Sequence, residues 1–320
     1  MDISVLIPTY NRAALLKKSL EALFEQSIKN FEIIIIDDGS TDTTKEIVKK
    51  MASEQKKLIE KAIILRYFKQ KNTGQGNARN FGIKHAQGDI CLLIGDDIIG
   101  TQKFLEEHVK LHKKHHKENV AVLGRIEWHP DIKITPFMKW ITNGSCILGK
   151  YGGHQFAFEK LEGKKEADYR FFYTSNISLK TSLLKKNPFD SDFQKYGWED
   201  IELGYRLTKK MKLKIYYNPE ALAFHYHPMN EKSLKPRMRQ IAQSGFIIQK
   251  KYPELHAIPS RKKKFIFWLI SNPLALSIFS IARKLLPLKK MSAYYYYALS
   301  KKYYLEGLKS HKEPLKNVTS

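Results

Sequence analysis

Two adjacent carboxylates, Asp96 and Asp97, follow the apolar run Ile90-Cys91-Leu92-Leu93-Ile94 in a chain of 320 residues with a formal net charge of +24. A run this apolar, bounded by turn residues, is typical of a strand buried on both faces of a parallel sheet. Open α/β sheets bind ligands beyond the carboxyl ends of their strands. Two acids at such a point are suited to holding a divalent cation against a phosphate group. The pair therefore indicates an enzyme that uses an activated, phosphorylated substrate.

Three further polar clusters follow the ends of other predicted elements. Pro8-Thr9-Tyr10-Asn11-Arg12 comes after the first strand and Asp37-Asp38-Gly39-Ser40 after the second. An acid after the second strand commonly binds the ribose or base of a nucleotide in doubly wound folds. The third cluster, residues 72–80, is a glycine-bearing loop entering a helix, and it offers Arg79 to a phosphate. Because turns are rich in Gly, Asn and Asp in any protein, the clusters carry weight only together.

The elements that must position these clusters alternate between strand and helix. This alternation predicts an α/β fold with a doubly wound, mostly parallel sheet. Asn11 is the predicted N-cap of the first helix, and residues 126–173 fit no element clearly. The predicted strands are 3–7, 31–36, 62–68, 90–94, 120–123, 176–179 and 213–217. The predicted helices after the first are one that starts at the capping box Thr43-x-x-Glu46, and 76–86, 103–116 and 199–211.

Positive charge gathers at the back of the chain. Residues 1–205 carry 32 Lys and Arg against 27 Asp and Glu, whereas residues 206–320 carry 24 against 5. This division argues against reading the whole chain as a nucleic-acid binder. We expect a catalytic domain over residues 1–230 and a helical, basic region over residues 231–320.

Within the basic region, residues 265–281 form an apolar run broken by Ser271-Asn272-Pro273. The run is shorter than the ~20 residues that span a bilayer. Basic clusters flank it, so an in-plane segment at an anionic membrane surface is the favoured interpretation, with Trp268 and the run Tyr294–Tyr297 near the headgroups. The alternative is a buried C-terminal helical hairpin with a solvated cationic face.

The cysteines and the start of the chain bear on location. Cys91 falls inside a predicted buried strand, and it and Cys146 give no disulfide framework. The first residues run straight into a strand without the pattern of a secretory signal. These features predict a cytoplasmic protein, placed at the inner face of the cell membrane by its basic region.

Three motifs together resemble those of the family-2 inverting glycosyltransferases. They are residues 5–12 (VLIPTYNR), residues 36–42 (IDDGSTD) and Ala78-Arg79-Asn80-x-Gly82. The resemblance covers roughly residues 1–230, and it implies a single Rossmann-like sheet of the GT-A type. It also implies a set of residues that bind the nucleotide sugar: Pro8, Tyr10, Arg12, Asp37, Asp38, Arg79, Asp96 and Asp97.

The resemblance implies a divalent metal, Mn²⁺ or Mg²⁺, at an Asp-x-Asp motif. This chain has Gly95 at the first position of that motif, so Asp97 matches the last, metal-binding acid, and Asp96 could contact the ribose or share the ion. His225 and His227 would share a face of a strand, and His-x-His is a common metal site. In related transferases a histidine after the base helix joins the metal. His225 is our first choice and His227 the second, with a structural role for either as the alternative.

The motif that begins Gly197-Trp198-Glu199-Asp200 resembles the segment that supplies the family's catalytic base. Asp200 matches the base and Glu199 its neighbour, although acids are also favoured in the first turn of any helix. Asn176 and Trp198 are assigned to the acceptor side, and for Asn176 a turn residue is the alternative.

The sequence as a whole predicts a metal-dependent inverting glycosyltransferase. Its expected partners are a nucleotide sugar, on family grounds a UDP-sugar, and a glycan or lipid-linked acceptor. Two other classes stay open, a nucleotidyltransferase that makes nucleotide sugars and a non-catalytic glycan-binding protein. The first would usually carry a phosphate-binding glycine loop directly after the first strand, where this chain has Pro8-Thr9-Tyr10. The second would not require Asp97 and Asp200 at their positions.

Overall fold

The computed structural model describes residues 1–58, 63–143, 156–285 and 289–310, and it divides into two compact units. Unit 1 comprises Met1–Ile132, Leu161–Gln194 and Glu199–His227. Unit 2 comprises Lys133–Lys160, Lys195–Trp198 and Pro228–Ser320. Ala62, at the start of one predicted strand, and Cys146 lie outside the described residues, whereas Cys91 is buried as expected.

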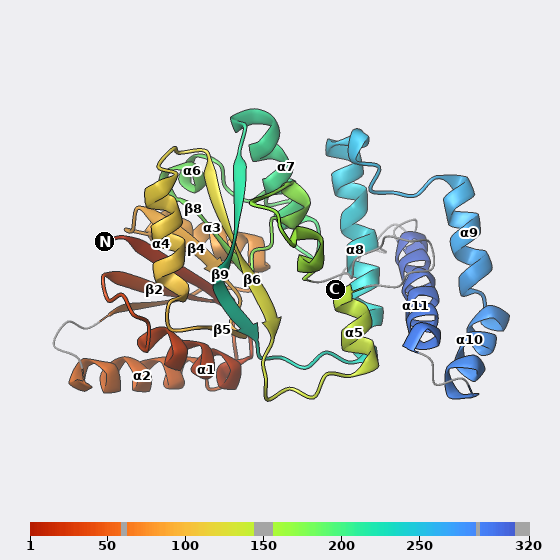
Figure 1. The fold of residues 1–320 in the computed structure, drawn as a ribbon, viewed down its shortest axis with the longest axis horizontal. Coiled ribbons are helices and arrows are strands. Elements are labelled where there is room, and N and C mark those ends of the chain that lie inside the picture. The colour runs from red at the N-terminus through yellow and green to blue at the C-terminus, as the bar shows by residue number, and fades with distance from the viewer. Residues whose placement is uncertain (59–62, 144–155, 286–288, 311–320) are drawn as a thin grey trace, which may run out of the picture. The chain divides into compact units, whose positions relative to one another are not determined.

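Unit 1 is built on one sheet in the order β3-β2-β1-β4-β8-β6-β9-β5, with β7 paired to β9 (Figure 1). β8 is antiparallel to both β4 and β6, and β6 is parallel to β9. The strands β1 to β4, β6 and β9 therefore share one direction, which confirms the mostly parallel sheet. The strands are β1 Ile3–Thr9, β2 Phe31–Asp37, β3 Ile64–Lys69, β4 Ile90–Ile94, β5 Ile98–Gly100, β6 Val120–Trp128, β7 Glu166–Ala167, β8 Asn176–Lys180 and β9 Lys214–His225.

Helices cover this sheet, and α1 and α2 lie side by side (Figure 1). α3 packs directly on the sheet at Gly82, where a Cβ would lie only 2.3 Å from Leu6 Cδ1 and 2.5 Å from Ile36 Cδ1. Only glycine permits so close an approach. The α-helices within unit 1 are α1 Ala13–Phe24, α2 Thr44–Leu58, α3 Gln75–His85, α4 Phe104–Lys114, α6 Thr181–Lys186 and α7 Glu199–Met211; the 3₁₀ turns η2 Phe158–Leu161 and η3 Tyr169–Phe171 lie in the segment left unassigned from sequence.

The prediction that Asn11 caps α1 is wrong. The N-cap position is Arg12, whose side chain makes no capping bond, and Asn11 has a left-handed φ of +52°. Asn11 Oδ1 instead accepts hydrogen bonds from the backbone N–H of Thr41 at 2.7 Å, while Asp42 Oδ2 accepts from the N–H of Ala13 at 3.0 Å. The helix start is thus capped by a carboxylate 29 residues away, which a local pattern does not reveal.

A buried polar network crosses the sheet at Asn176. Its Nδ2 donates to the carbonyls of Arg125 and Ala221, each at 3.0 Å, so its Oδ1 faces His108 Nε2 at 2.8 Å. His108 Nε2 must then carry the proton and Nδ1 must accept from Ser178 Oγ, 2.8 Å away. Asn176 is fully buried and its amide is engaged with protein. The structure therefore gives it a role in joining strands in place of the predicted acceptor contact.

His112 completes this network and is neutral in it. Since Ser178 gives its proton to His108, His112 Nε2 must donate to Ser178 Oγ, at 3.0 Å. Burial lowers the pKa of His108 to about 4 and that of His112 to about 3. Both imidazoles hence stay uncharged at neutral pH, and protonating His108 at Nδ1 would break its hydrogen bond from Ser178.

Unit 2 is helical. α11 lies between α8 and the pair α9 and α10 (Figure 1), and α5 packs on α11 through the rings of Phe137, Trp140 and Tyr296. Asn230 caps α8 by accepting from the N–H groups of Lys232 and Ser233. The helices are α5 Pro136–Asn143, α8 Glu231–Lys251, the 3₁₀ turn η4 Pro253–Leu255, α9 Arg261–Ser271, α10 Pro273–Leu285 and α11 Lys289–Ser310.

The buried imidazoles generate a pH prediction. Unfolded histidine protonates near its ordinary pKa of 6.5, whereas the folded pKa values of His108 and His112 lie lower. The unfolded state therefore binds more protons, and the free energy of unfolding should fall as the pH drops below about 6.5. Each site contributes at most about 1.4 kcal/mol per pH unit. Urea unfolding between neutral pH and about pH 5 measures the slope. His112→Leu should flatten it, and the matched change His116→Gln at an exposed histidine should not. A wild-type slope in His112→Leu would contradict the assignment.

Candidate active site

Arg12 clamps the two adjacent carboxylates. Its Nη1 lies 2.6 Å from Asp96 Oδ1 and its Nη2 lies 2.8 Å from Asp97 Oδ2. Thr9, the last residue of β1, donates its hydroxyl to Asp96 Oδ2 at 2.8 Å. Both carboxylates are buried, and they follow β4 directly. The carboxyl ends of β1 and β4 are thus joined by charge, as expected for neighbouring parallel strands.

The electrostatics of this cluster are unequal. Burial is the largest influence on both acids, and it raises the pKa of Asp96 to about 7 against the opposing charge of Arg12. Burial also disfavours ionised Asp97, but His225 and Arg12 outweigh it and lower the pKa of that carboxyl. Burial would lower the pKa of Arg12 too, yet the two carboxylates raise it. Two acids facing one guanidinium retain affinity for further positive charge.

His225 reaches the same carboxylate from β9. Antiparallel pairing sets Ile98 of β5 opposite His225, and the N–H of Tyr226 donates to the Asp97 carbonyl at 2.8 Å. His225 Nε2 then lies 3.4 Å from Asp97 Oδ2, so the structure brings together the two residues first chosen as metal ligands. The centroids of the His227 and His225 rings lie 6.3 Å apart, and burial lowers the pKa of His227.

The described residues contain no group of three or more His, Cys, Asp or Glu able to hold a metal ion. Asp97 and His225 nevertheless supply one carboxylate and one imidazole donor close together. Such a pair fits Mg²⁺ or Mn²⁺, which keep waters and bind largely through substrate phosphates. Gly95 favours this arrangement, because a Cβ there would lie 2.8 Å from Asp97 Oδ1 and displace the carboxylate.

Asp37 and Asp38, at the end of β2, bind the loops around them. Asp37 accepts from the N–H of Ser40 at 2.6 Å and from the hydroxyl of Tyr67. Asp38 Oδ2 accepts from the N–H of Gly74 at 2.9 Å, where the chain has a left-handed φ of +89°. In this structure Asp38 therefore shapes the glycine-bearing loop that leads into α3.

The other predicted nucleotide residues differ in exposure. Pro8 is half-buried within β1, and Tyr10 is exposed just after it. Arg79 is buried on α3, where its Nη2 lies 3.4 Å from Gln75 Oε1 and its guanidinium lies 5.7 Å from the ring centre of Phe189. Tyr10 thus offers a surface to a ligand, whereas Arg79 interacts within unit 1.

The predicted base segment begins α7 and is tied to α3. Glu199 is buried and accepts a hydrogen bond from Gln75 Nε2, across 124 residues of sequence. Asp200 is half-buried, and its Oδ1 accepts from the N–H of Ile201 at 2.8 Å. Both acids lie in the first turn of α7, where the helix dipole favours negative charge. Gln75 therefore joins the glycine-bearing loop to the acidic pair.

Trp198 precedes α7 in a strained turn. Its φ is +76°, uncommon for a bulky residue, and Gly197 before it has a φ of +101°. The indole N–H donates to the carbonyl of Ile241 at 3.1 Å within unit 2. An acceptor could therefore meet the ring of Trp198 but not its indole N–H.

Several contributors to this site were not predicted. Gln75, Thr9 and Tyr67 each hold a predicted residue in place, at Glu199, Asp96 and Asp37 respectively. Thr9 belongs to the predicted cluster at residues 8–12 and Gln75 to the one at residues 72–80, so their positions in the sequence could have marked them as site residues. Nothing local marks Tyr67, which lies on β3.

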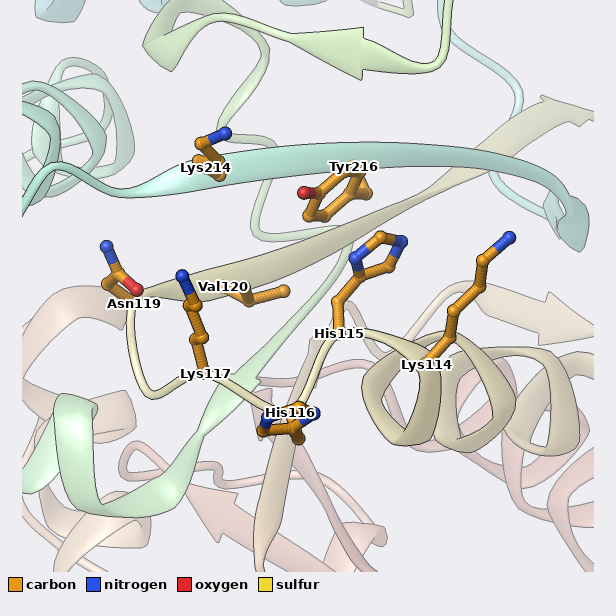
Figure 2. A pocket seen from close by; sticks show the side chains of 8 residues that line it. All are labelled: Lys114, His115, His116, Lys117, Asn119, Val120, Lys214 and Tyr216. Atoms are coloured by element: carbon orange, nitrogen blue, oxygen red, sulfur yellow. The ribbon is translucent and has the colours of Figure 1, made fainter.

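A cavity of about 300 Å³ lies elsewhere on unit 1 (Figure 2). Val120 and Lys214 line it, and these begin β6 and β9, whose other ends carry Trp128 and His225. The cavity is therefore at the far end of these strands from Asp97. Figure 2 shows lysines around His115 and Tyr216, whose rings stack with centroids 3.8 Å apart, and none of the described residues that line the cavity carries a carboxylate.

Comparison with known proteins bears on this site. The profile of glycosyl transferase family 2 matches residues 4–188. The chain is 27% identical over 290 residues to a chondroitin synthase of Escherichia coli, covering 82% of this chain and 40% of that protein. It is 29% identical over 267 residues to a dolichyl N-acetyl-glucosaminyl phosphate diacetamido-dideoxy-glucuronosyltransferase of Methanococcus voltae, covering 78% and 75%. The chain spans about half or less of the first curated relatives it matches, at 40% and 51%.

Solved structures share the fold. A mannosyltransferase of Pyrobaculum calidifontis in complex with GDP-Man and Mn²⁺ matches with a TM-score of 0.64 at 18% identity, over 97% of this chain and 88% of that one. Staphylococcus aureus TarS in complex with UDP-GlcNAc matches with a TM-score of 0.54 at 18% identity, over 96% and 92%. At these identities the likeness concerns the GT-A fold alone.

A substitution at Asp97 tests whether this residue is a metal ligand. Asp97→Asn removes the charge between Arg12 and His225 while keeping the size of the side chain. Binding of UDP in the presence of Mn²⁺, measured by calorimetry, should weaken about tenfold or more. Asp131→Asn, at an exposed aspartate, serves as the control. Unchanged Mn²⁺-dependent binding in the Asp97 variant would rule the residue out as a ligand.

Proposed function

Because the chain belongs to glycosyl transferase family 2, we propose that it is an inverting enzyme that transfers a sugar from a nucleoside diphosphate sugar to a hydroxyl group. The observation that carries the proposal is the cluster in which Arg12 bridges Asp96 and Asp97 and His225 lies 3.4 Å from Asp97. This cluster offers fixed charge of both signs at the carboxyl edge of the sheet, where such folds bind their ligands.

Asp97 and His225 would hold the divalent cation, Mn²⁺ or Mg²⁺, with His227 as the second-choice imidazole. When bound, such an ion offsets the negative charge that grows on the leaving diphosphate. Arg12 would orient the same diphosphate through the N–H groups that its ion pairs with Asp96 and Asp97 leave available, since a guanidinium binds phosphate oxygens well. Asp96, held by Thr9 and Arg12, would contact the ribose or share the ion.

Asp200 would act as the general base. As the acceptor oxygen bonds to the anomeric carbon, the hydroxyl proton passes to the Asp200 carboxylate. The bond between that carbon and the phosphate oxygen breaks, and its electron pair leaves with the nucleoside diphosphate. One such displacement inverts the anomeric configuration. Glu199, buried and bonded to Gln75, would fix the start of α7 and with it the position of Asp200.

For the donor we propose a UDP-sugar, and for the acceptor a glycan or a lipid-linked saccharide. The curated relatives include a chondroitin synthase and an enzyme that acts on a dolichyl phosphate-linked sugar, which supports an acceptor of this class. TarS binds UDP-GlcNAc, whereas the Pyrobaculum mannosyltransferase binds GDP-Man, so the nucleotide needs a direct test.

A screen of nucleotide sugars tests the class and the donor together. Each donor is incubated with the protein and Mn²⁺, and thermal stabilisation and hydrolysis are both recorded. We expect one UDP-sugar to raise the melting temperature and to release UDP slowly, because binding to the folded state alone stabilises it. In a parallel reaction with UTP and a sugar 1-phosphate, release of pyrophosphate would point to a nucleotidyltransferase instead. If donors bind but no nucleoside diphosphate is released from any of them, even when acceptors are supplied, the protein is not an enzyme of this class.

Asp200→Asn separates chemistry from binding. The amide keeps the size of the side chain but cannot take the proton, so transfer should slow by about a hundredfold or more. Mn²⁺-dependent UDP binding should stay near the wild-type value. The control is Asp192→Asn, at an exposed aspartate ahead of the same motif. Wild-type turnover in Asp200→Asn would exclude Asp200 as the base.

A further inference from the structure

α9 and α10 expose an unusual amount of apolar surface. Leu274, Ile278, Ile281 and Leu285 repeat at helical spacing and form one stripe along α10, with exposed fractions from 56% to 73%. Single exposed apolar residues are common on proteins, but a continuous stripe marks a surface that meets a partner or a membrane.

α9 continues this surface with aromatic residues. Phe265, Ile266, Trp268 and Leu269 are exposed, and the rings of Phe265 and Trp268 stack with centroids 5.8 Å apart. The opposite side of α9 is packed, because Phe267 is buried with Lys301 of α11 5.0 Å from its ring centre. The exposed face of α9 is therefore the one left over after the helix has packed within unit 2.

Charge on the same helices identifies the partner. α9 and α10 together contain six Lys or Arg and no Asp or Glu. Arg261 and Lys262 are exposed and lie one turn before Phe265 and Ile266, on the same face of α9. An aliphatic and aromatic face with cations beside it is complementary to an anionic bilayer, whose headgroups pair with the cations while the acyl boundary receives the aliphatic side chains.

The geometry also bears on how the segment meets the bilayer. Among the described residues no single helix is long and apolar enough to cross a membrane, although α9 and α10 pass that test as a pair bent by 50°. The apolar residues lie on exposed faces, while Phe267, Ser271 and Leu276 turn inward. A helix that crosses a bilayer is apolar on all sides that meet lipid, whereas a one-sided face suits a helix lying in the surface.

We propose that α9 and α10 form a docking surface for anionic lipid. Both helices would lie in the plane of a bilayer surface, such as the cytoplasmic leaflet of a membrane. Trp268 inserts at the level of the headgroups, the stripe of α10 enters the acyl boundary, and Arg261 and Lys262 pair with lipid phosphates or carboxylates. The surface is independent of the proposed transfer reaction, and its binding is measured without donor or acceptor.

Co-sedimentation of the full chain with vesicles tests this surface. We expect binding to vesicles of phosphatidylcholine mixed with phosphatidylglycerol, and weak binding to phosphatidylcholine alone. Phe265→Ser with Trp268→Ser should weaken binding about tenfold or more. Arg261→Gln with Lys262→Gln should weaken it by about fivefold per charge at low salt, and added salt should reduce that difference.

Matched controls keep the result specific. Met211→Ser changes an exposed apolar residue of unit 1, and Lys45→Gln with Lys49→Gln removes two exposed charges of α2. These variants should bind as the wild type does, and circular dichroism and the melting temperature should show that all variants are folded. Vesicle binding at the wild-type level by the variant with Phe265→Ser and Trp268→Ser would overturn the proposal.

Two further outcomes would also overturn it. Resistance of bound protein to extraction by alkaline carbonate would indicate that the bent pair crosses the bilayer. Self-association in solution that the same serine substitutions abolish, without vesicle binding, would assign the face to a second copy of this chain.

Discussion

The site depends on one charge arrangement, the fork that Arg12 makes with two neighbouring carboxylates. Adjacent buried aspartates repel each other and lose hydration, and a guanidinium with two parallel donors opposes both effects at once, although burial still raises the pKa of Asp96. The fork also dictates backbone positions, since Arg12 must arrive from the end of β1 while Asp96 and Asp97 leave β4. Removing Arg12 would leave uncompensated buried charge, which is more damaging than the loss of one contact.

Features that a short stretch of chain encodes were predictable. β2 is buried at every position, and its run of isoleucines could belong only to an interior strand. The polar clusters had to meet, because the carboxyl ends of parallel strands share one edge of a sheet. The order of elements followed from this logic, whereas the neighbourhood of Asp97 and His225 was implied by the resemblance to a large family.

Pairings between distant parts of the chain were not predictable. Asn11 was assigned to a helix start that Asp42 caps, and Asn176 to an acceptor that His108 replaces. In each case the residue type was informative, but the partner of the side chain lay 30 residues away for Asn11 and 68 for Asn176. Short polar side chains satisfy several kinds of partner equally well, so only the fold decides among them.

The place of β8 in the sheet has a consequence for the order of folding. β8 begins at Asn176 yet lies between β4, which ends at Ile94, and β6, which ends at Trp128. The strands β3, β2, β1 and β4 can pair as soon as the first part of the chain has left the ribosome, whereas β6 has no neighbour on that side until β8 emerges. During synthesis, β4 and β6 would thus present unpaired edges, which are open to wrong partners until one late strand closes the gap between them.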